Sequence, residues 1–136
     1  MNNLFKDHGP QATVLDLESS TLANTNFRAA IWTGCHLQVT LMSIPIDSEA
    51  GLEIHPNIDQ FLRVEAGRAK VLMGTSRDDL TFESDTEENC AILVPAGMWH
   101  NIINTGGEPL KLYSIYAPPN HRHGTVHATI QDAGSN

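Results

Sequence analysis

The chain has 136 residues, of which 40% are hydrophobic and 18% charged, so one domain with its own apolar core is expected and a disordered polymer is excluded. An excess of Asp and Glu gives a formal charge of −8, which repels a phosphate backbone and argues against nucleic acid as a partner. The N-terminus lacks the apolar stretch of a secretory signal, and no run approaches a membrane span, so we expect a cytoplasmic protein without a membrane partner.

Gly and Pro punctuate the chain often, with short runs of β-branched and aromatic residues between them. This pattern predicts an all-β sandwich or small barrel. The expected strands span residues 12–17, 29–33, 35–44, 51–55, 60–65, 68–73, 80–83, 90–94, 99–104 and 110–116. A weak helical pattern covers residues 19–26. The polar tail after Pro118-Pro119 has no pattern that demands order, and its histidines are assigned no ligand role: His121, His123 and His127.

The two cysteines, Cys35 and Cys90, lie far apart and form no CxxC spacing. This pattern predicts neither a small zinc site nor a disulfide framework, and favours two reduced, largely buried thiols. A single disulfide stays open for the case that the protein is exported.

Side-chain alternation groups the polar residues that could carry chemistry. Glu53 and His55 share one face of the expected strand 51–55. Residues 56–59 have the length of a hairpin loop, which would place Gln60 opposite His55. Metal-capable side chains therefore converge at the mouth of this expected hairpin.

A later strand adds a second histidine to this group. His100 shares its face with Met98 and Ile102, and Gln60 shares its own face with Leu62. Both polar residues thus lead rows of apolar neighbours, which is the usual layout of a small-molecule pocket in a barrel mouth. We expect Leu62, Met98 and Ile102 to line that pocket.

The opposite faces carry predictions of their own. Phe61, Trp99 and Ile103 face away from the pocket and are too apolar for water, so either the N-terminal strands or a second subunit should cover them. We expect a symmetric homodimer. In the strand 35–44, the apolar side chains are expected in the core and the polar ones on a wetter face: Leu37, Val39 and Leu41 against His36, Gln38 and Thr40.

Two motifs of the chain resemble those of the cupin family. The second motif is the stronger match: the family pattern P-x-G-x-x-H-x-x-x-N is filled by Pro95, Gly97, His100 and Asn104, although Asn89 stands where a leading glycine is usual. The family's first motif, G-x5-H-x-H-x3-4-E-x6-G, is degenerate in this chain.

In that first motif, Glu53 takes the place of the first His, His55 is the second His, and Gln60 takes the place of the Glu. Gly67 closes the pattern at the expected spacing, and Asp47 replaces the opening glycine. A neutral amide at position 60 cannot accept a proton as a carboxylate does, so family mechanisms that use that Glu as a base are in doubt here.

The resemblance covers about residues 35–117 and implies a double-stranded β-helix, or jelly-roll barrel. N-terminal strands over residues 1–34 and a C-terminal tail over 118–136 would flank this barrel. The run 101–119 is similar to small single-domain cupins of the mannose-6-phosphate-isomerase-like type. Such a likeness describes a fold and does not establish a reaction.

The donor set implied by the motifs is Glu53, His55, Gln60 and His100. Two imidazoles, one carboxylate and an amide oxygen suit a divalent transition metal (Fe, Mn, Ni, Co or Zn) and leave coordination positions open for a ligand. Asp59 is a stronger ligand than Gln60 and stays an alternative to Glu53 or Gln60, provided that a bulge turns it inward. Structural roles also stay open: a hydrogen-bonded histidine, an amide that bonds the hairpin, and a solvated strand-edge carboxylate.

Neighbouring residues are given structural interpretations. Pro95 and Gly97 are turn residues that place the following histidine, and Asn104 satisfies backbone groups of the next turn. Alternation does not decide whether Tyr113 or Tyr116 reaches the pocket.

These observations predict a metal-binding cupin that presents its ion to a small oxygenated metabolite such as a sugar or keto acid. An enzyme of this kind would be of the isomerase or dioxygenase type. The alternative is a non-catalytic module that binds or senses the same class of small molecule. No catalytic residue is assigned, and the absence of a P-loop, a Rossmann fingerprint and a G-x-S-x-G elbow argues against nucleotide-dependent and serine-hydrolase chemistry.

Overall fold

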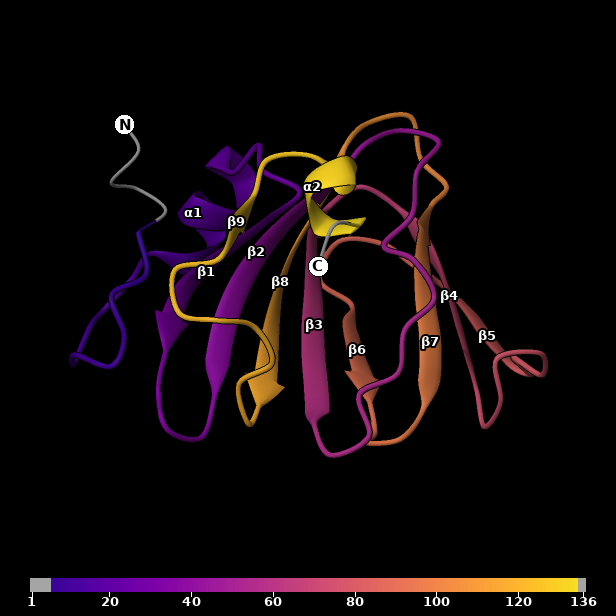
Figure 1. The fold of residues 1–136 in the computed structure, drawn as a ribbon. Helices are drawn as coiled ribbons and strands as arrows, with labels where there is room; N and C mark the ends of the chain where they lie inside the picture. Colours follow the sequence, from indigo (N-terminus) through magenta and orange to yellow (C-terminus); the bar gives the residue numbers. More distant parts are fainter. Residues whose placement is uncertain (1–5, 135–136) are drawn as a thin grey trace.

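The short β-branched runs of the sequence form two β-sheets with the hydrophobic core between them (Figure 1). The computed structural model describes residues 6–134. The elements in chain order are α1 (Leu17–Ala23), β1 (Arg28–Thr33), β2 (Gln38–Ile44), β3 (Asp59–Ala66), β4 (Ala69–Gly74), β5 (Phe82–Thr86), β6 (Ala91–Val94), β7 (Trp99–Asn104), β8 (Leu110–Ala117), β9 (Val126–His127) and α2 (Ile130–Gly134).

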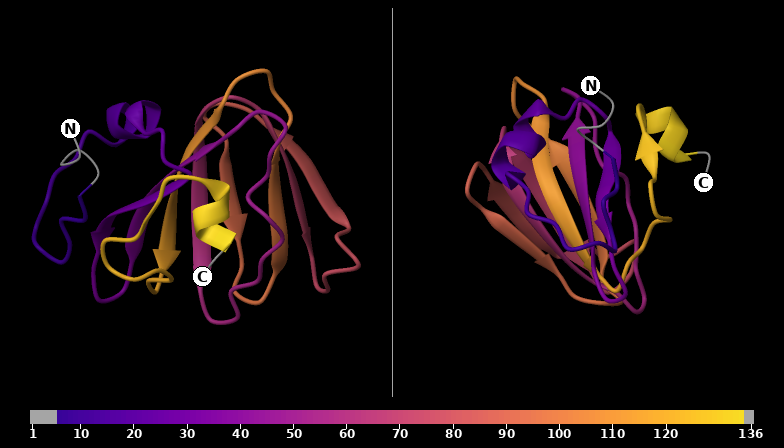
Figure 2. Two further views of the ribbon diagram at one scale, coloured as in Figure 1. Left: turned by 45° about the horizontal axis from the view of Figure 1, so that its top comes forward. Right: turned by 90° about the vertical axis from the view of Figure 1, so that its left-hand side faces the viewer.

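The larger sheet has the strand order β6-β3-β8-β2-β1-β9, and the smaller one has the order β5-β4-β7. The strand pairs within both sheets are antiparallel, so neighbouring strands place their paired side chains on a common face. The two views of Figure 2 show the sheets splayed apart at one end and closer together at the other. The expected all-β double-stranded β-helix is confirmed.

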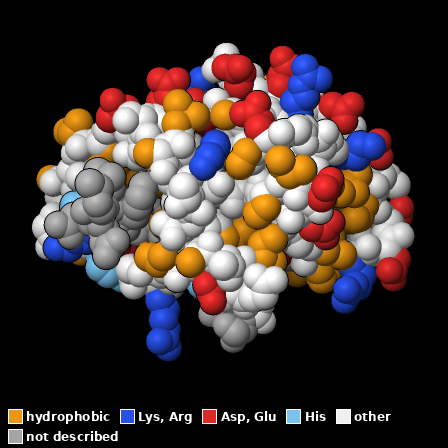
Figure 3. Space-filling view, turned by 90° about the horizontal axis from the view of Figure 1, so that it is seen from above, with side chains coloured by type: hydrophobic (Ala, Val, Ile, Leu, Met, Phe, Trp, Pro, Cys, Tyr) orange, Lys and Arg blue, Asp and Glu red, His pale blue; other side chains and the backbone are white. Residues whose placement is uncertain are grey.

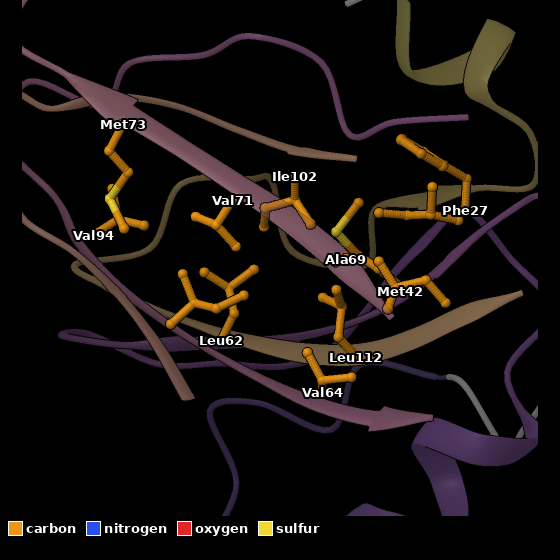
Figure 4. Packing of buried hydrophobic residues seen from close by; sticks show 13 residues of the cluster. Phe27, Met42, Leu62, Val64, Ala69, Val71, Met73, Val94, Ile102 and Leu112 are labelled. Atoms are coloured by element: carbon orange, nitrogen blue, oxygen red, sulfur yellow. The ribbon is translucent and has the colours of Figure 1, made fainter. Parts of the chain in front are cut away.

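Inward-facing side chains from both sheets fill the core (Figure 4). Leu62 on β3 and Leu112 on β8 lie opposite Val71 on β4 and Ile102 on β7, and all four are buried. Alternation along β3 and β8 explains this, because every second residue of an antiparallel strand faces the same side. Leu62 and Ile102, expected as pocket lining, therefore lie within the packed core.

Along β2 the expected alternation is wrong for Gln38 and Thr40, whereas Leu41 is buried and His36 exposed as expected. Gln38 and Thr40 are completely buried on the face that carries the core residues Met42 and Ile44, while Leu37 is 39% exposed. The other face of β2 is buried as well, because α1 packs against β2, β3 and β8. Because both faces of β2 are covered, the hydrophobicity of its residues does not show which face points into the barrel.

The expected strand over residues 12–17 is wrong. No regular structure covers residues 12–16, and α1 begins at Leu17, two residues before the expected helix. Asp16 caps this helix by accepting a hydrogen bond from the Ser19 N–H at 3.1 Å, and Glu18 adds a negative charge to the first turn. This N-terminal signal outweighs the β-branched residues that precede it.

The C-terminal tail is ordered in the structure, contrary to expectation. It folds back so that β9 pairs with β1 and α2 lies in front of β3 in Figure 1. The side chain of Gln38 fastens the tail: its Oε1 accepts the N–H groups of Asn120 (3.1 Å) and His121 (2.8 Å), and its Nε2 donates to the His121 carbonyl at 2.8 Å. The buried Gln38 amide thus provides hydrogen-bond partners for the tail, and these cannot be predicted from the composition of the tail alone.

Two turns hold non-glycine residues in the left-handed region. Asp47 has φ 63° and Asn89 has φ 75°, and these are the two positions where the opening glycine of a motif is replaced in this chain. Asp and Asn tolerate positive φ better than other side chains, so the turns are kept without glycine. At Gly67, φ is 98° and a Cβ would lie 3.1 Å from the Leu110 Cα, which explains why this glycine is retained.

The outer faces are partly covered by the chain itself. Phe61 stacks on Tyr113 with ring centroids 6.3 Å apart, and the Arg77 guanidinium lies 5.5 Å from the Trp99 ring centroid. Phe61, Trp99 and Ile103 are half-buried. The homodimer expected over this face stays a prediction.

The surface is acidic in places and carries scattered apolar groups. Seen from above, Asp and Glu side chains lie along the edge of the molecule with hydrophobic ones between them (Figure 3). Cys35 is exposed and Cys90 half-buried, and both thiols are free, so the expected burial is wrong for Cys35. Within residues 6–134, no helix has the length and apolar character needed to cross a bilayer.

Candidate metal centre

Glu53 and His100 are cross-strand neighbours although Glu53 lies outside the named strands. The Glu53 N–H donates to the His100 carbonyl at 3.0 Å, and the His100 N–H donates to the Glu53 carbonyl at 2.9 Å. A second bridge joins Glu49 to Ile103. The segment before β3 therefore runs along β7, and the carboxylate and the imidazole emerge on the same face.

The hairpin expected between residues 51–55 and 60–65 is wrong. The first of these segments bridges β7, whereas β3 pairs with β6 and β8. His55 is nevertheless held close by, because the Gly97 N–H donates to the His55 carbonyl at 3.0 Å. Gly97 has φ 80°, which the turn before β7 requires. A backbone hydrogen bond thus joins His55 of the first motif to Gly97 of the second.

Three potential ligand groups converge at this point. One ligand atom each from Glu53, His55 and His100 lies within 4.8 Å of the others. His55 Nε2 is 4.0 Å from Glu53 Oε1, and the two imidazole centroids are 5.3 Å apart. Donors of one transition metal lie about 3–3.4 Å apart when adjacent and about 4.2 Å apart when opposite, so side-chain rotations that draw the three groups together would bring them to one ion.

The histidine tautomers suit ligation. His100 Nδ1 lies 3.1 Å from the Met98 carbonyl, so Nδ1 carries the proton and Nε2 keeps its lone pair. Burial lowers the pKa of His55, the nearby Glu53 carboxylate opposes this, and the charges of His100 and Arg28 lower it further. The net lowering keeps His55 neutral, which is the form that binds metals.

Gln60 faces the same interior. Its neighbours on that face, Leu62 and Val64, belong to the core, and its register partner on β8 is Tyr116, whose ring centroid lies 5.7 Å from that of His55. Gln60 Nε2 donates to Ser114 Oγ at 2.8 Å, while the buried Oε1 has no hydrogen-bond partner. The amide is therefore oriented with its acceptor free.

Asp59, the alternative ligand, lies elsewhere. It is exposed at the start of β3, and its Oδ1 accepts the Ala96 N–H at 2.9 Å. No bulge turns it inward, so it supports the turn before β7. Met98 is half-buried and lines a surface hollow with Pro95 and Leu93.

Asn104 has the structural role expected for it. Its Nδ2 donates to the carbonyls of Ile44, Pro45 and Glu108, and its Oδ1 accepts the Gly106 N–H at 2.9 Å. Both ends of the amide are therefore engaged by the turns.

Unpartnered buried polar atoms gather around this interior. Among residues 6–134, five buried side-chain polar atoms have no hydrogen-bond partner, and four of them belong to inward-facing residues: Arg28 Nε, Thr40 Oγ1, His55 Nε2 and Gln60 Oε1. Their shared face follows from the register, which pairs Arg28 with the core residue Met42. Native proteins leave few such groups unsatisfied, so this concentration indicates a place for a ligand, an ion or water.

The second half of the site comes from residues that sequence reasoning did not select. Tyr116 is 1% exposed, and burial raises the pKa of its phenol, so it stays protonated. Its hydroxyl is 3.3 Å from His121 Nε2, and the His121 ring lies 6.4 Å from that of His127. His127 Nδ1 is in turn 3.3 Å from Arg28 Nη1. A chain of polar side chains therefore leads from the candidate metal ligands to β1 and β9.

A signal for Arg28 does exist in the sequence. It stands between Phe27 and the apolar run 29–31, and an isolated charge in such a run indicates burial with a specific role. His121 and His127 offer no comparable signal, because only the return of the tail to β1 brings them inside.

The comparisons with known proteins agree with this fold. Residues 40–116 match the family described as "Cupin domain". This match covers more than half of the chain, which belongs to the cupin family.

Similar proteins extend over nearly the whole chain. The uncharacterized protein YrkC of Bacillus subtilis (strain 168) is 59% identical over 132 residues, covering 97% of this chain and 71% of YrkC. The uncharacterized protein L612 of Acanthamoeba polyphaga mimivirus is 39% identical, covering 91% of this chain and 76% of L612. The crystal structure of BH2720 from Bacillus halodurans has a TM-score of 0.95 and 57% identity, covering 96% of this chain and 99% of that one.

Proposed function

We propose that this cupin binds one divalent transition metal through Glu53, His55 and His100, with the Gln60 amide oxygen as a fourth donor. The observation that carries the proposal is the convergence of three ligand atoms within 4.8 Å, two of them on buried imidazoles. The unpartnered atoms His55 Nε2 and Gln60 Oε1 support it, because an ion would supply the partner that each lacks. Two imidazoles, one carboxylate and one amide oxygen suit Fe, Mn, Ni, Co or Zn.

The bound ion would serve a small oxygenated metabolite. When bound, such a metal polarises a carbonyl or activates a coordinated oxygen, which suits chemistry of the isomerase or dioxygenase type. This chain's residues would hold and orient the metabolite beside it, and the protonated Tyr116 phenol offers a fixed hydrogen-bond donor. The sheets bury both imidazoles, while the Glu53 side chain stays 36% exposed.

A second candidate is a non-catalytic module that binds or senses the same metabolite. Gln60 favours it, because an amide cannot take up a proton where the family's motif has a carboxylate. The carboxylate that the site does contain, Glu53, would be a metal ligand rather than a base. A binding module needs only the metal ligands and room for the metabolite. Both candidates therefore share the metal site.

Metal uptake tests the metal site that both candidate functions share. Protein purified without a histidine tag is stripped with a chelator, dialysed against Zn(II), Mn(II) or Ni(II), and analysed for bound metal. We expect one ion per chain, loss of binding in His55→Ala and His100→Ala, and full retention in His36→Ala, whose histidine is exposed outside the barrel. A parent protein that takes up no metal would contradict the proposal.

Turnover separates the two candidates. Metal-loaded protein is screened for oxygen consumption and carbonyl isomerisation with sugars and keto acids, beside ligand-induced thermal shifts. Turnover that disappears in His100→Ala supports the enzyme. Stabilisation by a ligand without turnover supports the binding module.

A further inference from the structure

Arg28 is a buried cation without a counter-charge. The residue is 4% exposed, and no carboxylate within residues 6–134 forms an ion pair with it. Its neighbours carry no carboxylate: His127 Nδ1 lies at 3.3 Å, the Tyr116 hydroxyl is beside it, and the Phe27 ring centroid lies 5.3 Å from its Cζ. Its Nε has no hydrogen-bond partner. Burying a guanidinium in this state is unfavourable unless an anion joins it during function.

The guanidinium has room beside it. Arg28 and Glu53 line one cavity of about 230 Å³, together with Gly51, Leu52 and the α2 residues Ile130 and Ala133. Helix α2 forms an outer wall, and it lies in front of β3 in the left view of Figure 2. Since Glu53 is a proposed metal ligand, the cavity borders both Arg28 and one member of the proposed metal centre.

The charge at this place selects the ligand. A divalent ion, the Glu53 carboxylate and the Arg28 guanidinium together carry a net charge of about +2, because a histidine that binds a metal does so as the neutral imidazole. A neutral sugar leaves this charge uncompensated in a buried site, whereas an anion neutralises it. The planar fork of a guanidinium, with a free Nε, matches a carboxylate by two parallel hydrogen bonds.

We propose that Arg28 binds the carboxylate of the ligand and that the ligands are small 2-oxo or 2-hydroxy carboxylates. This inference rests on the proposed function for the metal contact, which would hold the adjacent carbonyl or hydroxyl oxygen. It selects keto acids over neutral sugars. His127 and Tyr116 act as positioning residues that hold the guanidinium toward the cavity.

Calorimetric titration of the zinc-loaded protein tests the proposal. Pyruvate is compared with hydroxyacetone, which has the same carbonyl group but no carboxylate, and with inorganic phosphate. We expect pyruvate to bind tightest, and to bind about 10- to 100-fold more weakly to Arg28→Gln, the loss expected for charge-assisted hydrogen bonds. Arg77→Gln, which removes a cation outside the barrel, should bind pyruvate like the parent.

Metal analysis of the same variants separates the two proposals. Arg28→Gln should keep its zinc, because Arg28 is not a ligand. Unchanged pyruvate affinity in this variant, or pyruvate binding no tighter than hydroxyacetone, would overturn the inference and leave the metal site standing. Tighter, Arg28-dependent binding of phosphate would overturn the carboxylate assignment.

Two further arms keep the test decisive. If Arg28→Gln does not fold, Arg28→Lys keeps the charge but loses the fork, and pyruvate affinity should fall about 10-fold. If the parent takes up no metal, the proposed function fails, and pyruvate is titrated into the metal-free protein. Pyruvate binding that Arg28→Lys weakens still supports Arg28 as the carboxylate site, and absence of binding overturns it.

Discussion

Arg28 on β1 and His127 on β9 are register partners, and Arg28 Nη1 lies 3.3 Å from His127 Nδ1. The contact joins the first strand of the larger sheet to the returning tail, at the cavity beside the proposed metal ligands. Because the tail folds back over the barrel, residues near both ends of the chain lie beside proposed metal ligands that come from its middle.

Replacing His127 should therefore weaken ligand binding without removing the metal. In His127→Ala the guanidinium loses the acceptor that orients it, and we expect pyruvate affinity to fall roughly 5-fold, equivalent to about 1 kcal/mol. Calorimetry on zinc-loaded protein measures the change, with His36→Ala as the control. Loss of zinc from His127→Ala would show instead that His127 supports the metal centre.

Ser114 should tune metal affinity through Gln60. Its hydroxyl accepts the Gln60 amide N–H at 2.8 Å, and this contact points Oε1 toward the interior. Ser114→Ala should lower zinc affinity about 10-fold, the usual effect of a residue that orients a metal ligand. Gln60→Glu should raise the affinity, because a carboxylate replaces a neutral donor. Competition with a chromophoric chelator measures both, and unchanged affinity in both variants would exclude Gln60 from the site.

His121 should make the protein sensitive to mild acid. Burial, followed by the charges of Arg28, His127 and His55, lowers its pKa from 6.5 to about 3. Between pH 6.5 and pH 3 the unfolded chain binds a proton at His121 that the folded chain does not bind. The free energy of unfolding therefore has its full value above about pH 6.5 and falls as the pH drops toward 3.

Urea unfolding at pH 7 and pH 5 measures this effect. His121→Gln should lose less free energy of unfolding between the two pH values than the parent does. NMR titration of the parent should show a His121 ring that stays neutral at pH 5. A ring that titrates near pH 6.5 would refute the prediction.

Asp7 should add a second loss of stability at lower pH. Burial raises the pKa of its carboxyl, but hydrogen bonds from Thr33, Gly124 and Gly9, with the charge of His123, outweigh burial and leave the pKa below 3.8. The folded state thus favours the Asp7 carboxylate. The contribution of this carboxylate to the free energy of unfolding is full above about pH 4 and is lost as the pH falls through the lowered pKa.

The variant Asp7→Asn should be less stable by about 1–3 kcal/mol at pH 7, since an amide cannot accept all of these bonds. The difference from the parent should shrink as the pH falls below 4. Urea titrations at several pH values measure it. A difference that is constant with pH would show that the charge of Asp7 has no part in the effect.

The convergence of the candidate metal ligands was predictable, and their surroundings were not. Pro95, Gly97 and His100 form a local pattern whose turn and strand depend on neighbouring residues only, so the motif predicts their arrangement. Glu53 comes to the same place by bridging β7, whereas the hairpin predicted for it was wrong; its role as a ligand stays a prediction.

The polar half of the site depends on long-range structure. Gln38 and Thr40 were predicted on the wetter face because alternation along a strand does not say which face looks inward. His121 and His127 belong to a polar tail whose order comes from Gln38 and from pairing with β1. The composition of a tail does not reveal partners more than eighty residues away in sequence.

X-ray absorption spectroscopy of the zinc-loaded protein tests the metal centre most directly, because it counts the imidazoles bound to the ion. We predict two imidazoles together with oxygen donors in the parent, and one imidazole in His55→Asn or His100→Asn. A spectrum without imidazole scattering, or one that neither substitution changes, would contradict the assignment of His55 and His100 as ligands of a common metal.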